Sequence, residues 1–187
     1  MGEVAQRYGR LADEFARAVA AVPEDRWSSP SPCEGWTARD VVEHVCSTQG
    51  MFLGFVDEPA GDGPPVAEDP VGAWQTHADA VQAVLDDPAT PETAFSNPHT
   101  GEMPLDVAVD RFYTVDVFMH TWDLTRATGQ DDALDPGLAA ELLAGMEPID
   151  ELLRSSGQYG RRVAVPDDAP VQDRLVAFIG RDPAWRP

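Results

Sequence analysis

The sequence predicts an all-α protein, with a bundle of four long helices followed by a short C-terminal helical extension. Nearly all periodic apolar residues recur at the three- and four-residue spacing of a helix. Runs of β-branched residues are short, and the best strand candidate is residues 161–166, RRVAVP. The 187 residues, 43% of them hydrophobic, suffice to bury one core, so we expect a single domain over residues 1–187.

The first two helices are recognised by their ends. Residues 3–21 carry apolar side chains at helical spacing until Pro23 ends the pattern. After a loop rich in Pro and Ser, Thr37 is a suitable N-cap, and Asp40 three residues later forms a shortened capping box. We therefore expect the second helix over residues 38–55.

The third and fourth helices are separated by a long loop. Residues 71–85 place apolar side chains on one stripe, whereas residues 86–104 contain several turn signals and are expected to be a loop. The fourth helix begins near Pro104 and Leu105, because proline is tolerated in a first turn, and stops at Gly129. Long loops before the second and fourth helices leave room for a crossover.

The C-terminal third is also helical. Residues 135–157 have the pattern of a fifth helix, and Pro148 lies inside that pattern. Because proline removes a helical hydrogen bond, we expect a kink or break there. One last short helix is expected over residues 171–179.

The charge and composition exclude several classes of function. The formal net charge of −20, from 33 acidic and 13 basic residues, would repel nucleic acid and anionic membranes, so we expect neither as a partner. The chain contains no lysine, which excludes Schiff-base chemistry and a Walker-type phosphate loop.

The two cysteines, Cys33 and Cys46, are too few for a disulfide framework and fit a reducing compartment. Cys46 is expected to be a buried structural thiol. Cys33 lies in the loop before the second helix, where a reactive thiol is conceivable. Without a signal-peptide pattern or a run of about 18 apolar residues, we expect a cytoplasmic protein.

Three polar residues occupy the apolar side of the fourth helix. At about 100° per residue, Asp116 and His120 lie about 40° apart, and Asp123 lies about 20° to the other side of Asp116. Burying such groups is costly unless each has a partner. Side chains four residues apart reach the same point, so Asp116 and His120 can hold a divalent metal, with His44 of the second helix as third ligand. This set leaves coordination positions open, as in catalytic zinc sites.

A structural interpretation also accounts for this pattern. Asp116 and His120 can form an ordinary hydrogen bond between positions i and i+4 in a helical protein without metal. His77 on the third helix is a weaker candidate, at the surface or behind the ligands. His99 lies in the turn-like stretch SNPHTG and is expected to be a solvated loop residue, although either histidine can still reach an open site.

Three blocks of the sequence resemble a known family. They are VPEDRWSSPSPCEGWTARDVVEHV, FYTVDVFMHTWDLTRATG and VPDDAPVQDRLVAFIGRDP. They are similar to actinobacterial metal-binding proteins related to the N-terminal domain of mycothiol-dependent maleylpyruvate isomerase, within the DinB-like superfamily. The resemblance implies a DinB-like four-helix bundle that holds a divalent metal, usually zinc and sometimes nickel. The implied ligands map onto His44, Asp116 and His120.

The resemblance also implies a function. Family members of known activity use a low-molecular-weight thiol such as mycothiol, whose sulfur the metal binds. We therefore expect a metal-dependent thiol S-transferase, monomer or homodimer, that acts on a small electrophile. Asp123 and Arg126 are weak candidates for supporting or substrate-orienting residues, or else they form a surface pair. The alternatives are a non-catalytic metal- or small-ligand-binding bundle and a structural helical protein without metal.

Overall fold

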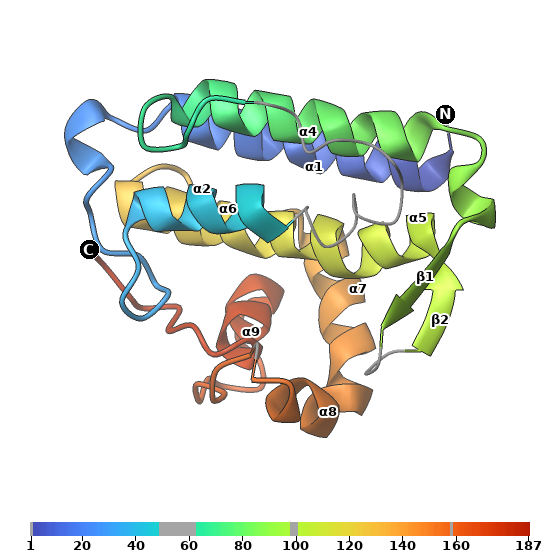
Figure 1. The fold of residues 1–187 in the computed structure, drawn as a ribbon. Coiled ribbons are helices and arrows are strands. Elements are labelled where there is room, and N and C mark those ends of the chain that lie inside the picture. Colours follow the sequence, from blue (N-terminus) through green and yellow to red (C-terminus); the bar gives the residue numbers. More distant parts are fainter. Residues whose placement is uncertain (1, 49–62, 98–100, 158) are drawn as a thin grey trace.

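The computed structural model describes residues 2–48, 63–97, 101–157 and 159–187. The main bundle is all-helical, which confirms the predicted class (Figure 1). It consists of α1 (Glu3–Ala20), α2 (Ala38–Thr48), α4 (Pro70–Asp86) and a continuous run made of α5 (Leu105–Ala108), η3 (Val109–Thr114) and α6 (Val115–Thr128). In the part of the chain that is described, no helix is long and apolar enough to cross a membrane.

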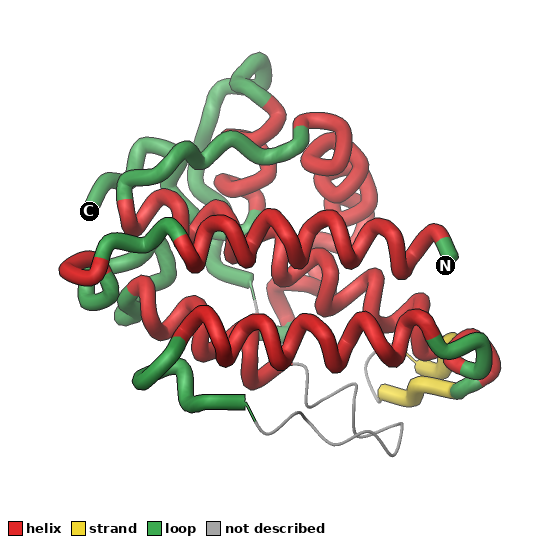
Figure 2. Tube along the Cα trace, turned by 90° about the horizontal axis from the view of Figure 1, so that it is seen from above, coloured by secondary structure: helices red, strands yellow, loops and turns green. Residues whose placement is uncertain are grey.

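The helices of the bundle are arranged around one apolar core. Helix α1 packs against α4 and α6, and α2 packs against the same two helices, so α1 and α2 lie at opposite corners. The chain therefore crosses the bundle between α1 and α2, as the long loop permits. The rings of Phe15 and Trp74 meet edge to face with centroids 4.7 Å apart, and Trp74 Nε1 donates to the carbonyl of Ala12 at 3.2 Å. These contacts join α1 to α4, which run side by side in both views (Figure 2).

The C-terminal extension packs below α6 in Figure 1. It contains α7 (Pro136–Met146), η4 (Glu147–Ile149), α8 (Asp150–Ser155) and α9 (Val171–Phe178). The predicted break at Pro148 is confirmed, since this residue lies in the short 3-10 turn η4. A second apolar cluster attaches the extension to α6, and its members include Phe118, Met119, Leu175 and Phe178.

The strand prediction was wrong. Residues 161–166 form no strand, and the Val163 amide instead donates to the Ala177 carbonyl of α9 at 3.0 Å. Among the described residues, the strands are β1 (Ala94–Asn97) and β2 (Gly101–Pro104), which pair antiparallel inside the stretch expected to be a loop. Phe95 is the one large apolar side chain of β1 and is buried, which is too short a pattern to be read as a strand.

The fourth helix differs from a regular α-helix in its middle. The segment η3 is π-helical, and it ends directly before the turn that carries Asp116. Single π-helical turns often accompany functional sites. Gly129 ends α6 with φ of 75°, as the sequence predicts. The expected continuation of the second helix over residues 49–55 lies outside the described residues, and so does His99.

Candidate metal centre

The loop before α2 and the start of α2 are fixed by local hydrogen bonds. Thr37 and Asp40 form the predicted capping box, because the Thr37 amide donates to Asp40 Oδ2 at 2.7 Å and the Asp40 amide donates to Thr37 Oγ1 at 3.3 Å. In the preceding turn, the amide of Trp36 donates to the carbonyl of Cys33 at 3.0 Å. These bonds place Cys33 and Trp36 beside α2, with His44 two turns along the helix.

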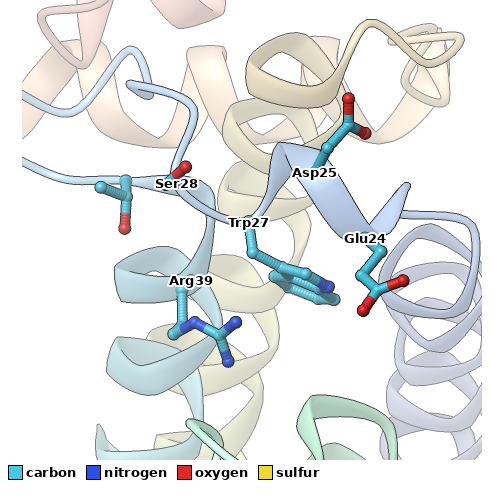
Figure 3. A pocket seen from close by; sticks show the side chains of 6 residues that line it. Glu24, Asp25, Trp27, Ser28 and Arg39 are labelled. Carbon is cyan, nitrogen blue, oxygen red and sulfur yellow. The ribbon is translucent and has the colours of Figure 1, made fainter.

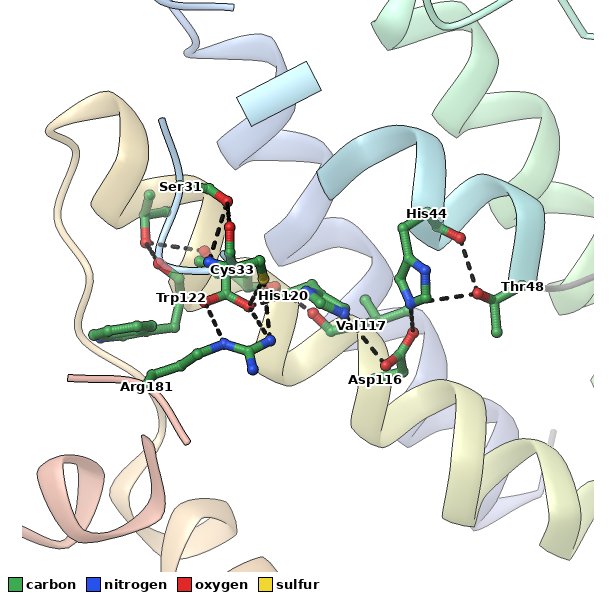
Figure 4. A network of polar contacts seen from close by, with 12 residues as sticks. Ser31, Cys33, His44, Thr48, Asp116, Val117, His120, Trp122 and Arg181 are labelled. Atoms are coloured by element: carbon green, nitrogen blue, oxygen red, sulfur yellow. Dashed lines mark hydrogen bonds and ion pairs between the residues drawn. The ribbon is translucent and has the colours of Figure 1, made fainter. Parts of the chain in front are cut away.

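His44, Asp116 and His120 come together between α2 and α6 (Figure 4). Asp116 Oδ2 lies 3.2 Å from His44 Nε2, and Asp116 Oδ1 lies 3.4 Å from His120 Nε2. The two imidazole rings are 4.8 Å apart at an angle of 66°. Exposure of the side chains falls from 35% at His44 through 20% at Asp116 to 7% at His120, so the cluster opens on the α2 side.

A second set of contacts begins at Nδ1 of His120, on the side of the ring away from Asp116. His120 Nδ1 lies 2.9 Å from Oδ2 of Asp123, whose side chain is completely buried. Arg181 binds both oxygens of this carboxylate, through Nε to Oδ1 and Nη2 to Oδ2, each at 3.1 Å. Such paired bonds are the strongest arrangement between arginine and a carboxylate. Asp123 therefore pairs with His120 and Arg181 inside the fold and is not part of a surface pair.

Cys33 joins the same network from the loop before α2. Its thiol donates to Asp123 Oδ2 at 3.2 Å and accepts from Arg181 Nη2 at 3.0 Å. Burial raises the pKa of the Cys33 thiol, which favours the protonated form. The geometry gives Cys33 the role of a buried hydrogen-bonding partner rather than that of a reactive thiol.

The two carboxylates of the site favour the ionised form, although Asp116 is partly and Asp123 completely buried. Burial alone would raise their pKa values. At Asp116, His120 and His44 outweigh burial and hold the pKa well below its usual value. At Asp123, His120 and Arg181 lower the pKa in the same way. For His120, burial opposes the charged form, but Asp116 and the hydrogen bond to Asp123 raise its pKa well above the usual value.

The donor set fits a divalent metal. Two ligand atoms about 2.05 Å from a tetrahedral zinc ion lie about 3.3 Å apart. The corresponding distances here are 3.2 Å from Asp116 to His44 and 3.4 Å from Asp116 to His120. Asp116 Oδ2 is buried and accepts no hydrogen bond from the described residues, although it faces His44. Two imidazoles and a carboxylate are ligands that zinc and nickel accept.

Residues 8–125 match the model of the family described as the mycothiol maleylpyruvate isomerase N-terminal domain. The chain belongs to this family. Two uncharacterized proteins from two strains of Mycobacterium tuberculosis are each 34% identical to it over 175 residues, which cover 92% of this chain and 94% of the relative. Another uncharacterized protein of that species is 36% identical over 50 residues, 27% of this chain and 20% of the relative. No solved structure gives a significant match.

The part that matches the mycothiol maleylpyruvate isomerase N-terminal domain contains His44, Asp116, His120 and Asp123 but ends before Arg181.

Cys33, His120 and Asp123 form a second group with metal-binding side chains. The guanidinium of Arg181 already lies in contact with the thiol and the carboxylate of that group. A metal ion there would be repelled by this fixed positive charge. The group therefore fits a metal poorly.

Two of the weaker sequence candidates lie apart from the cluster. Arg126 does not form the alternative surface pair with Asp123: its Nε lies 2.6 Å from Asp132 and its guanidinium covers the Trp122 ring at 4.9 Å. His77 lies on α4 and is in neither group of metal-binding side chains among the described residues. Its Nδ1 is buried without a hydrogen bond, and burial lowers its pKa.

Sequence reasoning missed Trp36 and Arg181. Trp36 lies against both imidazoles, with ring centroids 4.9 Å from His44 and 5.8 Å from His120. Both missed residues stand inside the blocks that carried the family resemblance, CEGW and IGRDP. Their positions in these blocks were a signal, but no periodicity indicates which way a loop residue points.

A separate hollow of about 280 Å³ lies beside the start of α2 (Figure 3). In its lining, the guanidinium of Arg39 lies 5.3 Å from the centroid of the Trp27 ring. Arg39 also donates to the carbonyls of Val66 and Ala67 at 2.9 and 3.0 Å. Arg39 is therefore already paired with these groups. Its contacts beside the hollow join α2 to the segment before α4. None of the cluster residues lines it.

Proposed function

We propose that this chain is a divalent-metal-dependent thiol S-transferase, which uses mycothiol or a similar low-molecular-weight thiol to attack a small electrophile. The observation that carries the proposal is the meeting of His44 Nε2, the Asp116 carboxylate and His120 Nε2, whose ligand atoms all lie within 4.8 Å of one another. The family description connects the chain with mycothiol.

In this proposal His44, Asp116 and His120 hold the metal, with zinc favoured and nickel second. Asp123 accepts a hydrogen bond from Nδ1 of His120, so Nε2 is the nitrogen that faces the proposed metal and gives up its proton when the metal binds. The Trp36 ring lies against both imidazoles. Three protein ligands are typical of catalytic zinc sites, in which a further position takes water or substrate.

The metal, when bound, supplies a positive charge that lowers the pKa of a thiol presented to it. The thiol proton leaves to solvent, and the sulfur attacks the electrophilic carbon to form a carbon–sulfur bond. In a substitution, the leaving group departs with the electron pair of its bond. The partly exposed His44 marks the side from which both reactants approach.

The proposal is tested by metal content, thiol binding and turnover together. We expect about one metal per chain in wild type. In cobalt-loaded protein, adding mycothiol should produce near-ultraviolet charge-transfer absorption, and conjugation of mycothiol to chlorodinitrobenzene should require the metal. His44→Gln should lose all three signals. His77→Gln is the matched control, because it removes a histidine that lies outside the cluster.

Each alternative function predicts a different result in these assays. A metal-loaded protein that shows no absorption change and no turnover with any thiol would be a non-catalytic metal-binding bundle. Less than about 0.1 metal per chain, with His44→Ala as stable as wild type, would favour a structural role for the cluster. The ion pairs of Asp116 with both histidines are the observation that supports this last alternative.

A further inference from the structure

Asp123 is a completely buried carboxylate whose charge needs a fixed partner. Its neighbour along the helix, Arg126, pairs with Asp132 instead. The cation that reaches Asp123 is Arg181, 58 residues further along the chain and itself only 16% exposed. One carboxylate oxygen, Oδ2, also faces the thiol of Cys33 and the ring of His120.

The turn after α9 determines where Arg181 points. The amide of Arg181 donates to the carbonyl of Val176 at 2.8 Å, and the amide of Gly180 donates to that of Ala177 at 3.2 Å. This pair of bonds is the Schellman motif, which requires a left-handed residue, here Gly180 with φ of 95°. The backbone of Gly160 lies so close that a Cβ on Gly180 would approach it to 2.7 Å. These backbone bonds and the contact with Gly160 fix the position from which the Arg181 side chain starts.

The orientation of His120 follows from this arrangement. Asp123 is held as a carboxylate by two bonds from Arg181, so it can only accept hydrogen bonds. Its Oδ2 lies 2.9 Å from Nδ1 of His120, and Nδ1 must then carry the proton. This leaves Nε2 of His120 directed at Asp116, where the metal site is proposed.

We propose that Arg181 is a positioning residue for the metal centre: through Asp123 it fixes the tautomer and the ring orientation of His120, and thereby sets the affinity of the site for its metal. This inference rests on the proposed function. It assigns a role to the C-terminal extension, because Arg181 lies beyond residues 8–125, which match the family. Groups that accept a hydrogen bond from the second ring nitrogen of a metal-binding histidine strongly affect the affinity for the metal.

The test measures zinc affinity in full-length protein by competition with a chromophoric chelator, together with the visible spectrum of the cobalt-loaded form. Arg181→Gln should bind zinc about 10- to 100-fold more weakly than wild type, and its cobalt spectrum should change. Arg181→Lys should lie in between, because lysine keeps the charge but cannot make two parallel bonds. Arg186→Gln is the matched control: this exposed arginine of the same tail bonds only the carbonyl of Trp185 in the described contacts.

A purely structural role would lower the thermal midpoint of the metal-free Arg181→Gln protein but leave its zinc dissociation constant and cobalt spectrum as in wild type. That result overturns the inference while the proposed function stands. Should Arg181→Gln fail to fold, Arg181→Lys decides, and a wild-type dissociation constant in it overturns the inference. A wild-type protein that binds no zinc overturns the proposed function and this inference together.

Discussion

The indole of Trp36 lies stacked beside the imidazole of His120, with ring centroids 5.8 Å apart and ring planes within 20° of parallel. The same indole lies 4.9 Å from the ring of His44. One residue of the loop before α2 thus touches both histidines of the proposed metal centre. The fluorescence of Trp36 should therefore respond to what the histidines bind.

Titration with nickel, whose partly filled d shell quenches nearby indoles, should reduce the fluorescence of the wild-type protein. Trp36→Phe should remove most of this quenching, because the other tryptophans are not in contact with the cluster in the described ring pairs. The control is Trp27→Phe, which removes an indole that packs on Arg39. Equal quenching in wild type and Trp36→Phe would show that nickel binds elsewhere.

Removal of metal should lower thermal stability. With free zinc at 100 times its dissociation constant, binding adds about 2.7 kcal/mol to the free energy of unfolding. For a chain of this size, that corresponds to roughly 5–10 °C in the thermal midpoint. Differential scanning calorimetry with zinc and with a chelator measures the shift. His44→Gln should show no shift, and an equal shift in that variant would argue for zinc binding outside the cluster.

The capping box of α2 predicts a pH-dependent loss of stability. Asp40→Ala should lower the free energy of unfolding by about 1 kcal/mol at pH 7, because it removes the hydrogen bonds that Asp40 accepts from Thr37. Hydrogen bonds from the Thr37 hydroxyl and amide lower the pKa of Asp40 in the folded protein. Its stabilisation is then fully present above the unfolded pKa of about 3.9, and it is lost as the pH falls through the lower folded value.

Urea unfolding of wild type and Asp40→Ala at several pH values measures this effect. The difference in unfolding free energy should be constant from neutral pH down to about pH 5 and should shrink as the pH falls below about 4. Asp13→Ala, at an exposed position of α1, is the control for replacing a surface aspartate. A difference that stays the same at low pH would mean that the ionised carboxylate of Asp40 does not cap the helix.

Because the backbones of Gly160 and Gly180 lie close together, replacing each glycine with alanine should destabilise the protein to a different extent. Gly180→Ala should destabilise the protein by at least about 2 kcal/mol, because the left-handed backbone disfavours a side chain and the new Cβ would meet the Gly160 backbone. Gly160→Ala should be milder, since its Cβ would have its nearest neighbour, Gly180 Cα, at 3.4 Å. Chemical denaturation of both compares them, and equal effects would contradict this backbone arrangement.

Much of the bundle and the cluster of His44, Asp116 and His120 could be predicted, because the relevant patterns are local. Helical spacing placed Asp116 and His120 on one face, and the capping box placed the start of α2 six residues before His44. The hairpin was missed because four-residue strands with one buried ring carry little period-two signal.

The support of the centre could not be predicted, because it joins residues far apart in the sequence. Cys33 and Asp123 are 90 residues apart, and Arg181 reaches Asp123 across 58 residues. Such contacts depend on how the loop before α2 and the turn after α9 close over α6. Local periodicity carries no information about that closure.

The ion pair between Asp123 and Arg181 has a consequence for the order of events during synthesis. A nascent chain that has reached residue 125 already contains His44, Asp116, His120 and Asp123, but the carboxylate of Asp123 still lacks its cation. Only after the turn behind α9 has formed is that charge neutralised and the ring of His120 fixed. In the proposed centre, the support of His120 is therefore complete only once the C-terminal extension has packed against α6.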